Sequence, residues 1–256
     1  MILVKALLLA AIFVQINSQC PDHEIEIYNG CPFPIWPAVF APFHQWTNDG
    51  FRLEKYASRT IRVPCRWKSA RIWARTDCDG SGRNCETGDC GALKCQGAGQ
   101  ADVSLAELTL DGGGNNNFKN DVYDISAVDG FNLPISITPI NGVKIGQQFG
   151  FSAKYDCVKT ECKFDFRNNC LNELKKWVRG RVASCLSACT KFNNDQFCCR
   201  GVFNNPQTCP VKHDRLVRYF KDRCPDMYSY AYDDEASTFH CQGERGTKYT
   251  VAFCPP

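Results

Sequence analysis

Residues 70–95 read ARIWARTDCDGSGRNCETGDCGALKC, and this stretch joins the two patterns that indicate the fold. In its first part, Ala70-Arg-Ile-Trp-Ala-Arg75, apolar and polar side chains alternate with a period of two, which is typical of a β-strand. The second part is rich in cysteine and glycine and has almost no large apolar side chains. Residues 78–99 are therefore expected to form a small disulfide-rich loop subdomain.

The same alternation recurs along the chain, in residues 23–28, 60–63, 103–110, 122–128, 135–137 and 249–253. Gly, Asn, Asp and Pro separate these short segments, and Asp111-Gly-Gly-Gly-Asn-Asn-Asn117 is interpreted as a flexible turn between two of them. The sequence therefore predicts an all-β fold with an antiparallel β-sandwich core. This core is expected to comprise about residues 20–77, 100–156 and 225–256.

One segment has a helical period instead. Its apolar side chains follow each other at steps of three and four, which predicts a helix with one apolar stripe, although Gly180 weakens it. The stripe consists of Leu171, Leu174, Val178, Val182, Cys185 and Cys189. Cysteines crowd around it with little apolar sequence between them, so residues 157–224 are expected to form a disulfide-rich helical lobe.

The first residues predict export. Met1-Ile-Leu-Val-Lys5 leads into the apolar run Ala6–Val14, and Asn17-Ser18-Gln19 follows. Residues 1–18 are therefore interpreted as a signal peptide, with residues 19–256 as the mature domain. No later segment approaches the roughly 20 apolar residues of a transmembrane helix. We expect a secreted, extracellular protein.

Charge and cysteine use exclude several classes of function. The formal net charge is only +3, which argues against nucleic acid as a partner. The 18 cysteines are even in number and absent from the predicted leader, which indicates an oxidised disulfide framework. Zinc is the alternative, but Cys85, Cys90 and Cys95 lack the C-x-x-C spacing of a tetrahedral site. No metal and no cofactor are expected.

Several blocks of sequence resemble the thaumatin family. The most specific is Cys85-Glu-Thr-Gly-Asp-Cys90-Gly, followed by Cys95-Gln-Gly-Ala-Gly99. Further blocks, in the family's order, are Arg71-Ile-Trp-Ala-Arg-Thr76, Leu105-Ala-Glu107, Asp124-Ile-Ser-Ala-Val-Asp-Gly-Phe-Asn132-Leu-Pro134, Ser187-Ala-Cys189, Cys198-Cys199, Cys224-Pro-Asp226, Tyr228-Ser-Tyr230 and Phe253-Cys-Pro255. The chain is identified as a member of this family, which includes osmotin and pathogenesis-related proteins. It departs from the family pattern in a shortened stretch between Cys78 and Cys85 and in an insertion at 141–155.

The resemblance implies eight disulfides. They are Cys31–Cys254, Cys78–Cys85, Cys90–Cys95, Cys157–Cys241, Cys162–Cys224, Cys170–Cys185, Cys189–Cys198 and Cys199–Cys209. Cys20 and Cys65 remain, and exposed free thiols rarely persist in an oxidising compartment. We therefore predict a ninth bond between them, which ties the N-terminal extension to the end of the 61–63 strand.

The resemblance also implies an acidic cleft between the sandwich and the cysteine-rich lobe. Its residues would be Arg71, Glu107, Asp124, Asp129 and Asp233, with Asp234 as the alternative for the last place. Glycoside hydrolysis needs one protonated and one ionised carboxyl group. Converging acids raise one pKa by repulsion, whereas an arginine keeps a neighbouring carboxyl ionised. We assign Glu107 as the acid, since alternation along its strand lets its carboxyl group project into a groove. We assign Asp129 as the base, with Asp124 as the next candidate for that role.

A plainer interpretation stands beside this one. Acids on strands beside an arginine are more often a salt-bridged or solvated face than a catalytic pair. Aromatic rings near the matched acids could stack on sugars or equally belong to the core: these are Tyr123, Phe131, Tyr228 and Tyr230. The histidines, His23, His44, His213 and His240, show no metal spacing and receive no function.

Three functions follow from the sequence. The resemblance implies a secreted, antifungal defence protein that binds β-1,3-glucan of fungal cell walls through the acidic cleft. The first alternative is a weak endo-β-1,3-glucanase that uses the same cleft. The second is a stable extracellular scaffold that binds a protein, a receptor or a membrane surface. A monomer is expected in each case.

Overall fold

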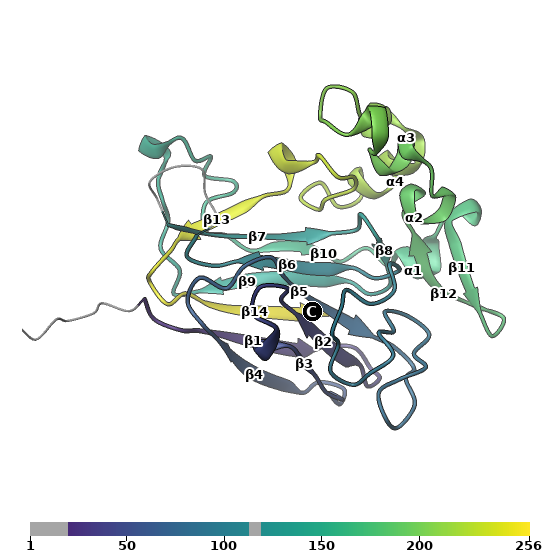
Figure 1. Cartoon of the computed structure of the whole chain (residues 1–256), viewed down its shortest axis with the longest axis horizontal. Coiled ribbons are helices and arrows are strands. Elements are labelled where there is room, and N and C mark those ends of the chain that lie inside the picture. The colour runs from purple at the N-terminus through teal and green to yellow at the C-terminus, as the bar shows by residue number, and fades with distance from the viewer. Residues whose placement is uncertain (1–19, 113–118) are drawn as a thin grey trace, which may run out of the picture.

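The computed structural model describes residues 20–112 and 119–256 (Figure 1). The predicted signal peptide, residues 1–18, and most of the turn predicted at 111–117 lie outside the described residues. Within the described chain, no helix has the length and apolar character needed to cross a membrane.

Two sheets form the body of the molecule (Figure 1). The six-stranded sheet has the order β13 (Phe239–Gln242), β7 (Asn120–Ser126), β6 (Leu105–Thr109), β5 (Ala70–Arg75), β2 (Trp36–Phe40) and β3 (Asp49–Gly50). The five-stranded sheet has the order β10 (Thr160–Cys162), β9 (Ile135–Ile140), β14 (Lys248–Phe253), β1 (His23–Asn29) and β4 (Ser58–Val63). The first and last strands, β1 and β14, lie side by side and run parallel. The other strand pairs of these two sheets are antiparallel.

The core of the molecule lies where apolar faces of both sheets meet. Ile25 and Ile27 of β1 are fully buried, as are Ile72 of β5 and Ile125 of β7, and they belong to one cluster. In β1 buried residues alternate with partly exposed ones along the whole strand. The predicted all-β sandwich is therefore confirmed.

Each segment predicted as a strand contains one, in β1, β4, β5, β6, β7, β9 and β14. In these two sheets, the strands β2, β3, β10 and β13 were not predicted from the sequence. In β2, Trp36–Phe40, four consecutive residues are buried, so the segment shows no alternation from which a strand could be recognised.

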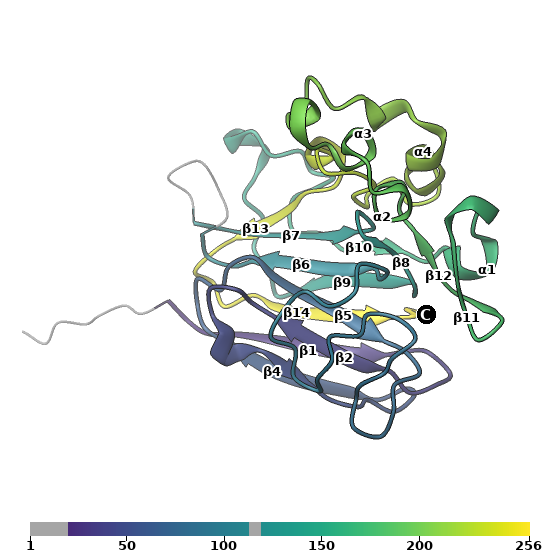
Figure 2. The same cartoon turned by 45° about the vertical axis from the view of Figure 1, so that its right-hand side comes forward.

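The segment from α1 to α4 lies at one end of the sandwich, as both views show (Figures 1 and 2). The lobe predicted at 157–224 also includes β10, which belongs to the five-stranded sheet, so the lobe begins after this strand. A small sheet joins β11 (Lys175–Val178), β12 (Arg181–Leu186) and β8 (Gly130–Phe131). The α-helices of the lobe are α1 (Phe166–Asn169), α2 (Ala188–Phe192), α3 (Asp195–Cys198) and α4 (Arg215–Lys221). Single 3-10 turns lie at Gln45–Thr47, Gln147–Phe149, Asn172–Leu174, Gly201–Phe203, Pro210–His213 and Asp234–Ala236.

The helix predicted over residues 171–189 is wrong, because β11 and β12 form a hairpin there. The tight turn consists of Arg179 and Gly180, both with positive φ, at 49° and 78°. A two-residue turn of this kind suits an antiparallel hairpin and interrupts a helix. The apolar residues of two strands and their turn happen to be spaced as on a single helix, which led to the wrong prediction.

The structure contains nine disulfides, and every cysteine takes part in one. The pairs are Cys20–Cys65, Cys31–Cys254, Cys78–Cys85, Cys90–Cys95, Cys157–Cys241, Cys162–Cys224, Cys170–Cys185, Cys189–Cys198 and Cys199–Cys209. These are the eight pairs that the family resemblance implies together with the ninth bond proposed from the two remaining cysteines.

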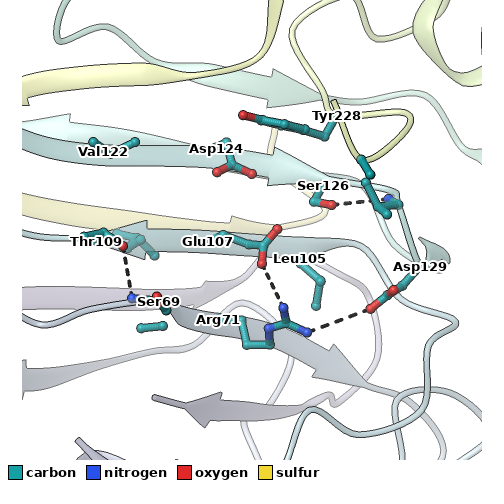
Figure 3. A pocket seen from close by; sticks show the side chains of 14 residues that line it. Ser69, Arg71, Leu105, Glu107, Thr109, Val122, Asp124, Ser126, Asp129 and Tyr228 are labelled. Carbon is teal, nitrogen blue, oxygen red and sulfur yellow. Dashed lines mark hydrogen bonds and ion pairs between the residues drawn. The ribbon is translucent and has the colours of Figure 1, made fainter. Parts of the chain in front are cut away.

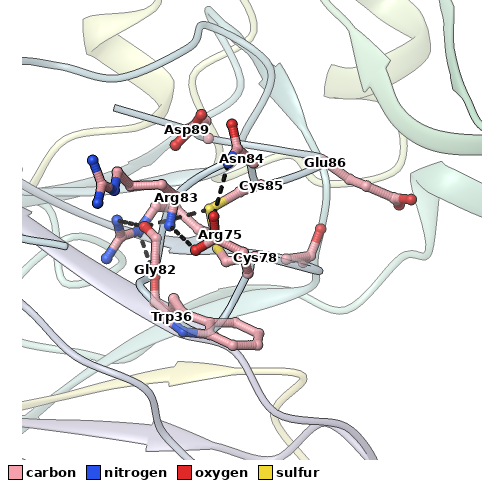
Figure 4. The surroundings of a disulfide bond; sticks show 12 residues. Trp36, Arg75, Cys78, Gly82, Arg83, Asn84, Cys85, Glu86 and Asp89 are labelled. Atoms are coloured by element: carbon pink, nitrogen blue, oxygen red, sulfur yellow. Dashed lines mark hydrogen bonds between the residues drawn. A yellow bond between two sulfur atoms is a disulfide. The ribbon is translucent and has the colours of Figure 1, made fainter. Parts of the chain in front are cut away.

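A buried arginine organises the loops that follow β5 (Figure 4). The Arg75 side chain is fully buried, and it donates hydrogen bonds to backbone carbonyl oxygens on both sides of it. The acceptors are Trp36 at 3.0 Å, Pro37 at 3.3 Å, Gly82 at 3.0 Å, Ala92 at 2.7 Å and Leu93 at 2.8 Å. Residues 78–99 are thus held against β2 and β5, although their division from the core as a subdomain stays a prediction.

Residues 141–155, predicted to be an insertion, are held by contacts with the rest of the chain. The Asp156 carboxylate accepts hydrogen bonds from the backbone N–H groups of Ile145, at 2.7 Å, and Gly146, at 2.8 Å. Lys154 forms an ion pair with Asp226 at 2.6 Å. These contacts fold the insertion back onto the body of the protein.

Candidate functional site

Arg71, Glu107 and Asp124 form a row across the six-stranded sheet. In the strand register, Arg71 of β5 lies opposite Glu107 of β6, and Glu107 lies opposite Asp124 of β7. Residues directly opposite each other on antiparallel strands share one face, so the three side chains project on the same side (Figure 3). The row therefore results from sheet register and not from proximity in sequence.

The row lines a pocket of about 480 Å³. Asp129, from the segment between β7 and β8, reaches the same pocket, and Tyr228 lies on its other side (Figure 3). Four of the residues predicted for the acidic cleft, one cation and three acids, thus converge here. The composition of the pocket matches a ligand with many hydroxyl groups, since carboxylates accept hydrogen bonds from them.

One guanidinium group contacts two of the three acids. An Arg71 Nη lies 3.2 Å from Glu107 Oε1, and the other Nη lies 4.0 Å from Asp129 Oδ2. All three side chains keep about a third of their surface exposed, at 29%, 31% and 32%. They are therefore open to a ligand while being held by each other.

Burial raises the pKa of all three acids, most strongly that of Asp124. The charges of Glu107 and Asp234 raise the pKa of Asp124 further, and Arg71 opposes the shift. Asp124 Oδ1 is buried and has no hydrogen-bond partner among the described residues. For Glu107 and Asp129, by contrast, Arg71 is an ion-pair partner and acts against the rise. Asp124 is therefore the carboxyl group that most readily stays protonated.

Asp233 does not line this pocket. Its carboxylate is buried, accepts hydrogen bonds from Ser229 N and Oγ at 3.0 and 2.9 Å, and forms an ion pair with Lys221 at 2.9 Å. The neighbouring Asp234 accepts a hydrogen bond of 2.9 Å from the hydroxyl group of Tyr228, a pocket residue. Of the two adjacent acids, the structure places Asp234 beside the pocket, while Asp233 holds the loop that carries both.

A sequence model of the thaumatin family matches residues 29–255 of this chain. The chain belongs to this family. One relative is pathogenesis-related protein 5 of Arabidopsis thaliana, which is 40% identical over 253 residues, or 97% of each chain. Another, from Prunus avium, is named glucan endo-1,3-beta-glucosidase and is 40% identical over 240 residues, or 90% of each chain.

Among solved structures, the thaumatin-like xylanase inhibitor TLXI aligns over 90% of this chain and 99% of its own, with 21% identity and a TM-score of 0.45. The resemblance drawn from the sequence motifs is confirmed by the family match. The protein is a member of the thaumatin-like, pathogenesis-related defence proteins.

Of the aromatic residues near the matched acids, Tyr228 alone lines the pocket of this thaumatin-family protein. Tyr123 and Phe131 are fully buried in the core, and Tyr230 belongs to an apolar cluster of the lobe. Tyr228 N donates to Ile125 O at 2.8 Å, and its hydroxyl group contacts Thr238 Oγ1 at 2.6 Å. The backbone and the hydroxyl end of the side chain are thus both anchored, and the ring is held beside the acids.

The hydroxyl-bearing residues of the pocket, Ser69, Thr109 and Ser126, were not predicted from the sequence. Thr109 follows Glu107 by two positions, and Ser126 follows Asp124 by two positions. Because side chains two apart on a strand share a face, this spacing was the signal that could have identified both.

Outside the pocket, the described residues contain two groups with three metal-ligand atoms close together. One group consists of Cys20, Cys65 and Asp111, but its cysteines form a disulfide. The other consists of His23, Asp111 and Asp121, in which both ring nitrogens of His23 already have hydrogen-bond partners. We assign a structural role to both groups.

Proposed function

We propose that this thaumatin-family protein is a secreted defence protein that binds β-1,3-glucan of fungal cell walls through the acidic pocket. The observation that carries the proposal is the row of Arg71, Glu107 and Asp124, with Asp129 beside it and the ring of Tyr228 opposite. The name of one relative, a glucan endo-1,3-beta-glucosidase, supports this ligand class, and the name of another, a pathogenesis-related protein, supports the defence role. The predicted signal peptide and the disulfide framework support secretion.

Each part of the pocket has a role in this proposal. The carboxyl groups of Glu107 and Asp129, paired with Arg71, accept hydrogen bonds from sugar hydroxyl groups, and Arg71 donates to ring or hydroxyl oxygens. The hydroxyl group of Tyr228 is already engaged, so this residue offers its ring to the apolar CH face of a pyranose.

A weak endo-β-1,3-glucanase activity is the second candidate, and the state of Asp124 favours it. A buried carboxyl with a strongly raised pKa can donate its proton to the oxygen of the leaving sugar. An ionised carboxylate held by Arg71, Asp129 in the first place, can then activate water or stabilise the oxocarbenium-like centre. In this scheme we propose Asp124 as the acid in place of Glu107.

Binding and reducing-end release on insoluble β-1,3-glucan test both candidates in one experiment. We expect the wild type to bind, and Glu107→Gln and Asp129→Asn to weaken binding about tenfold each through lost charge-assisted hydrogen bonds. If the protein is also a glucanase, Asp124→Asn abolishes end release while binding persists. The wild-type activity then falls as pH rises, because Asp124 loses its proton.

Tyr228→Phe is the matched control for Tyr228→Ala, because it keeps the ring and removes only the hydroxyl group. The proposal requires Tyr228→Phe to retain binding and Tyr228→Ala to lose it. Absence of wild-type binding to glucan would overturn the proposal, and the extracellular scaffold with a protein or membrane partner would take its place.

A further inference from the structure

Asp129 reaches the pocket from a segment that the cysteine-rich lobe holds in place. The following strand, β8, pairs with β12 of the lobe, and Asp129 O accepts a hydrogen bond of 2.7 Å from Thr190 Oγ1 of α2. Arg71, its ion-pair partner, lies instead on the six-stranded sheet. The distance between these two side chains therefore depends on how the lobe is positioned on the sandwich.

The packing beside Asp129 shows which segment sets that position. A Cβ atom added at Gly130 would lie 3.0 Å from Cys185 O and 3.3 Å from Asp102 Cα. Gly130 is therefore packed closely between the hairpin of β11 and β12 and Asp102. We call residues 77–102, which end at Asp102, the loop segment. Movement of the hairpin relative to this loop would displace Gly130 and its neighbour Asp129.

Lys176 of β11 holds the hairpin to that loop. Its ammonium group donates to Glu86 O at 3.0 Å and to Gln100 Oε1 at 3.2 Å, and it forms an ion pair with Asp102. The Asp102 side chain is only 4% exposed, and its other oxygen accepts a hydrogen bond of 2.7 Å from Gly88 N. Lys176 therefore neutralises a carboxylate that water hardly reaches.

Arg181 of β12 makes the second contact. Its guanidinium group donates twice to Glu86 Oε2, at 2.8 and 3.1 Å, and also contacts Asp77 at 2.5 Å. The Glu86 side chain is 3% exposed. Across the described chain, none of the nine disulfides joins the lobe to the loop segment, so ion pairs and hydrogen bonds hold this contact together.

We propose that Lys176 and Arg181, with Asp102 and Glu86 as their partners, form an ionic latch that regulates the acidic pocket by setting the position of Asp129 relative to Arg71. With the latch formed, Asp129 stays within ion-pair distance of Arg71 and is ready to bind a ligand. Without it, buried Asp102 loses its cation and buried Glu86 keeps only Arg179, at 3.9 Å, so the hairpin moves away and Asp129 moves with it. The inference rests on the proposed glucan-binding function for its consequence, but the latch itself is measurable without glucan.

The test compares Lys176→Met, Lys176→Arg and the control Arg215→Met in the full mature protein. Arg215 of α4 forms an exposed ion pair with Glu173 on the same lobe, so this control removes a lobe charge that takes no part in the latch. The first readout is the NMR titration of the Asp129 side-chain carboxyl carbon, and the second is the dissociation constant for a soluble β-1,3-glucan oligosaccharide. In Lys176→Met we expect the Asp129 titration to move to higher pH and the dissociation constant to rise about tenfold. Lys176→Arg keeps the charge, so both readouts stay close to their wild-type values. Arg215→Met changes neither readout.

The inference is overturned if Lys176→Met leaves the Asp129 titration and the dissociation constant at wild-type values. If Lys176→Met does not fold, Arg181→Met decides the matter by the same two readouts, because the Arg181 side chain is 58% exposed. Failure of the wild type to bind glucan would overturn the proposed function, and the Asp129 titration would still decide the latch.

Discussion

One cation serves several acids in the pocket. Arg71 lies within 4.0 Å of Asp129 and closer to Glu107, while Asp124 has no direct cationic contact among the described residues. Carboxyl groups of the same type therefore differ in how readily they ionise. The difference in pKa comes first from burial, which acts most strongly on Asp124, and then from position relative to one guanidinium group. This arrangement suits a proton donor at Asp124.

A second titratable cluster lies in the core, away from the pocket. His23 donates to or accepts from Asp111 at 2.7 Å, and Asp121 accepts hydrogen bonds from Asp111 N at 2.8 Å and from the Tyr249 hydroxyl at 2.7 Å. Burial raises the pKa of Asp121 to about 6. Burial lowers the pKa of His23, but its hydrogen bonds to Asp111 and Thr247 outweigh this and give a net rise.

This cluster predicts a stability that falls with rising pH. Asp121 holds its proton more tightly when folded, so the free energy of unfolding falls between about pH 4 and 6. The contribution of His23 is present below the usual histidine pKa of 6.5 and is lost as pH rises through the higher folded value. We expect Asp121→Asn to remove the slope between pH 4 and 6 and to stabilise the protein at pH 7 by about 1–3 kcal/mol.

Urea unfolding of Asp121→Asn and wild type from pH 4 to 7 tests this expectation. Glu161→Gln is a suitable control, since Glu161 is an exposed acid on β10 of the five-stranded sheet. An unchanged slope in Asp121→Asn would show that Asp121 is ionised throughout this range.

At the scale of the element, the end of β5 determines how the following loops pack. Arg75 is the last residue of the strand, and burial lowers its pKa to about 10, so it stays charged at neutral pH. It satisfies carbonyl groups of β2 and of residues 82–93 that face away from water. One strand-end side chain thus replaces the apolar core that these loops lack.

We predict that Arg75→Met destabilises the protein by about 3 kcal/mol or more, because several buried carbonyl groups lose their donor at once. Urea unfolding measures the loss, and hydrogen exchange of the amides in residues 82–93 locates it. Arg83→Met is the matched control, since Arg83 is an exposed arginine of the same loop whose side chain donates to Ser81 Oγ. Equal effects of the two variants would contradict the role given to Arg75.

At the scale of the whole molecule, covalent bonds close the chain on itself. The first strand, β1, lies between β14, the last, and β4, and Cys31–Cys254 bridges residues near the two ends of the described chain. Cys20–Cys65 closes a loop with a sequence separation of 45, beside the point where His23 pairs with Val63. It extends the β1–β4 pairing to the N-terminal side.

Removing Cys20–Cys65 by the double change Cys20→Ser, Cys65→Ser is expected to lower the free energy of unfolding by about 4 kcal/mol, from loop-closure entropy. The control pair Cys78→Ser, Cys85→Ser opens a loop with a separation of only 7, and about 2 kcal/mol is expected. Equilibrium unfolding under non-reducing conditions compares the two. A larger loss for the Cys78–Cys85 variant would show that local packing and not loop length determines the effect.

The sequence by itself determined the fold class, and it did so through local patterns. Alternation in a segment such as 23–28 depends on which face of the strand is buried, so a few neighbouring residues are enough to show it. The family motifs supplied Arg71, Glu107, Asp124 and Asp129, which do converge. Burial on both sides hid β2, because a strand without a solvent face shows no alternation.

Only the tertiary structure decided how the remaining residues act. The 171–189 segment reads as a helix until β8 provides a partner strand for β12. Asp233 and Asp234 are equivalent in sequence, but Lys221 pairs with the first and Tyr228 contacts the second. Likewise, the ionisation of Asp124 depends on burial and on charges from other strands. Pairing, desolvation and charge–charge interaction act across space between segments distant in the chain, so no local pattern of residues contains them.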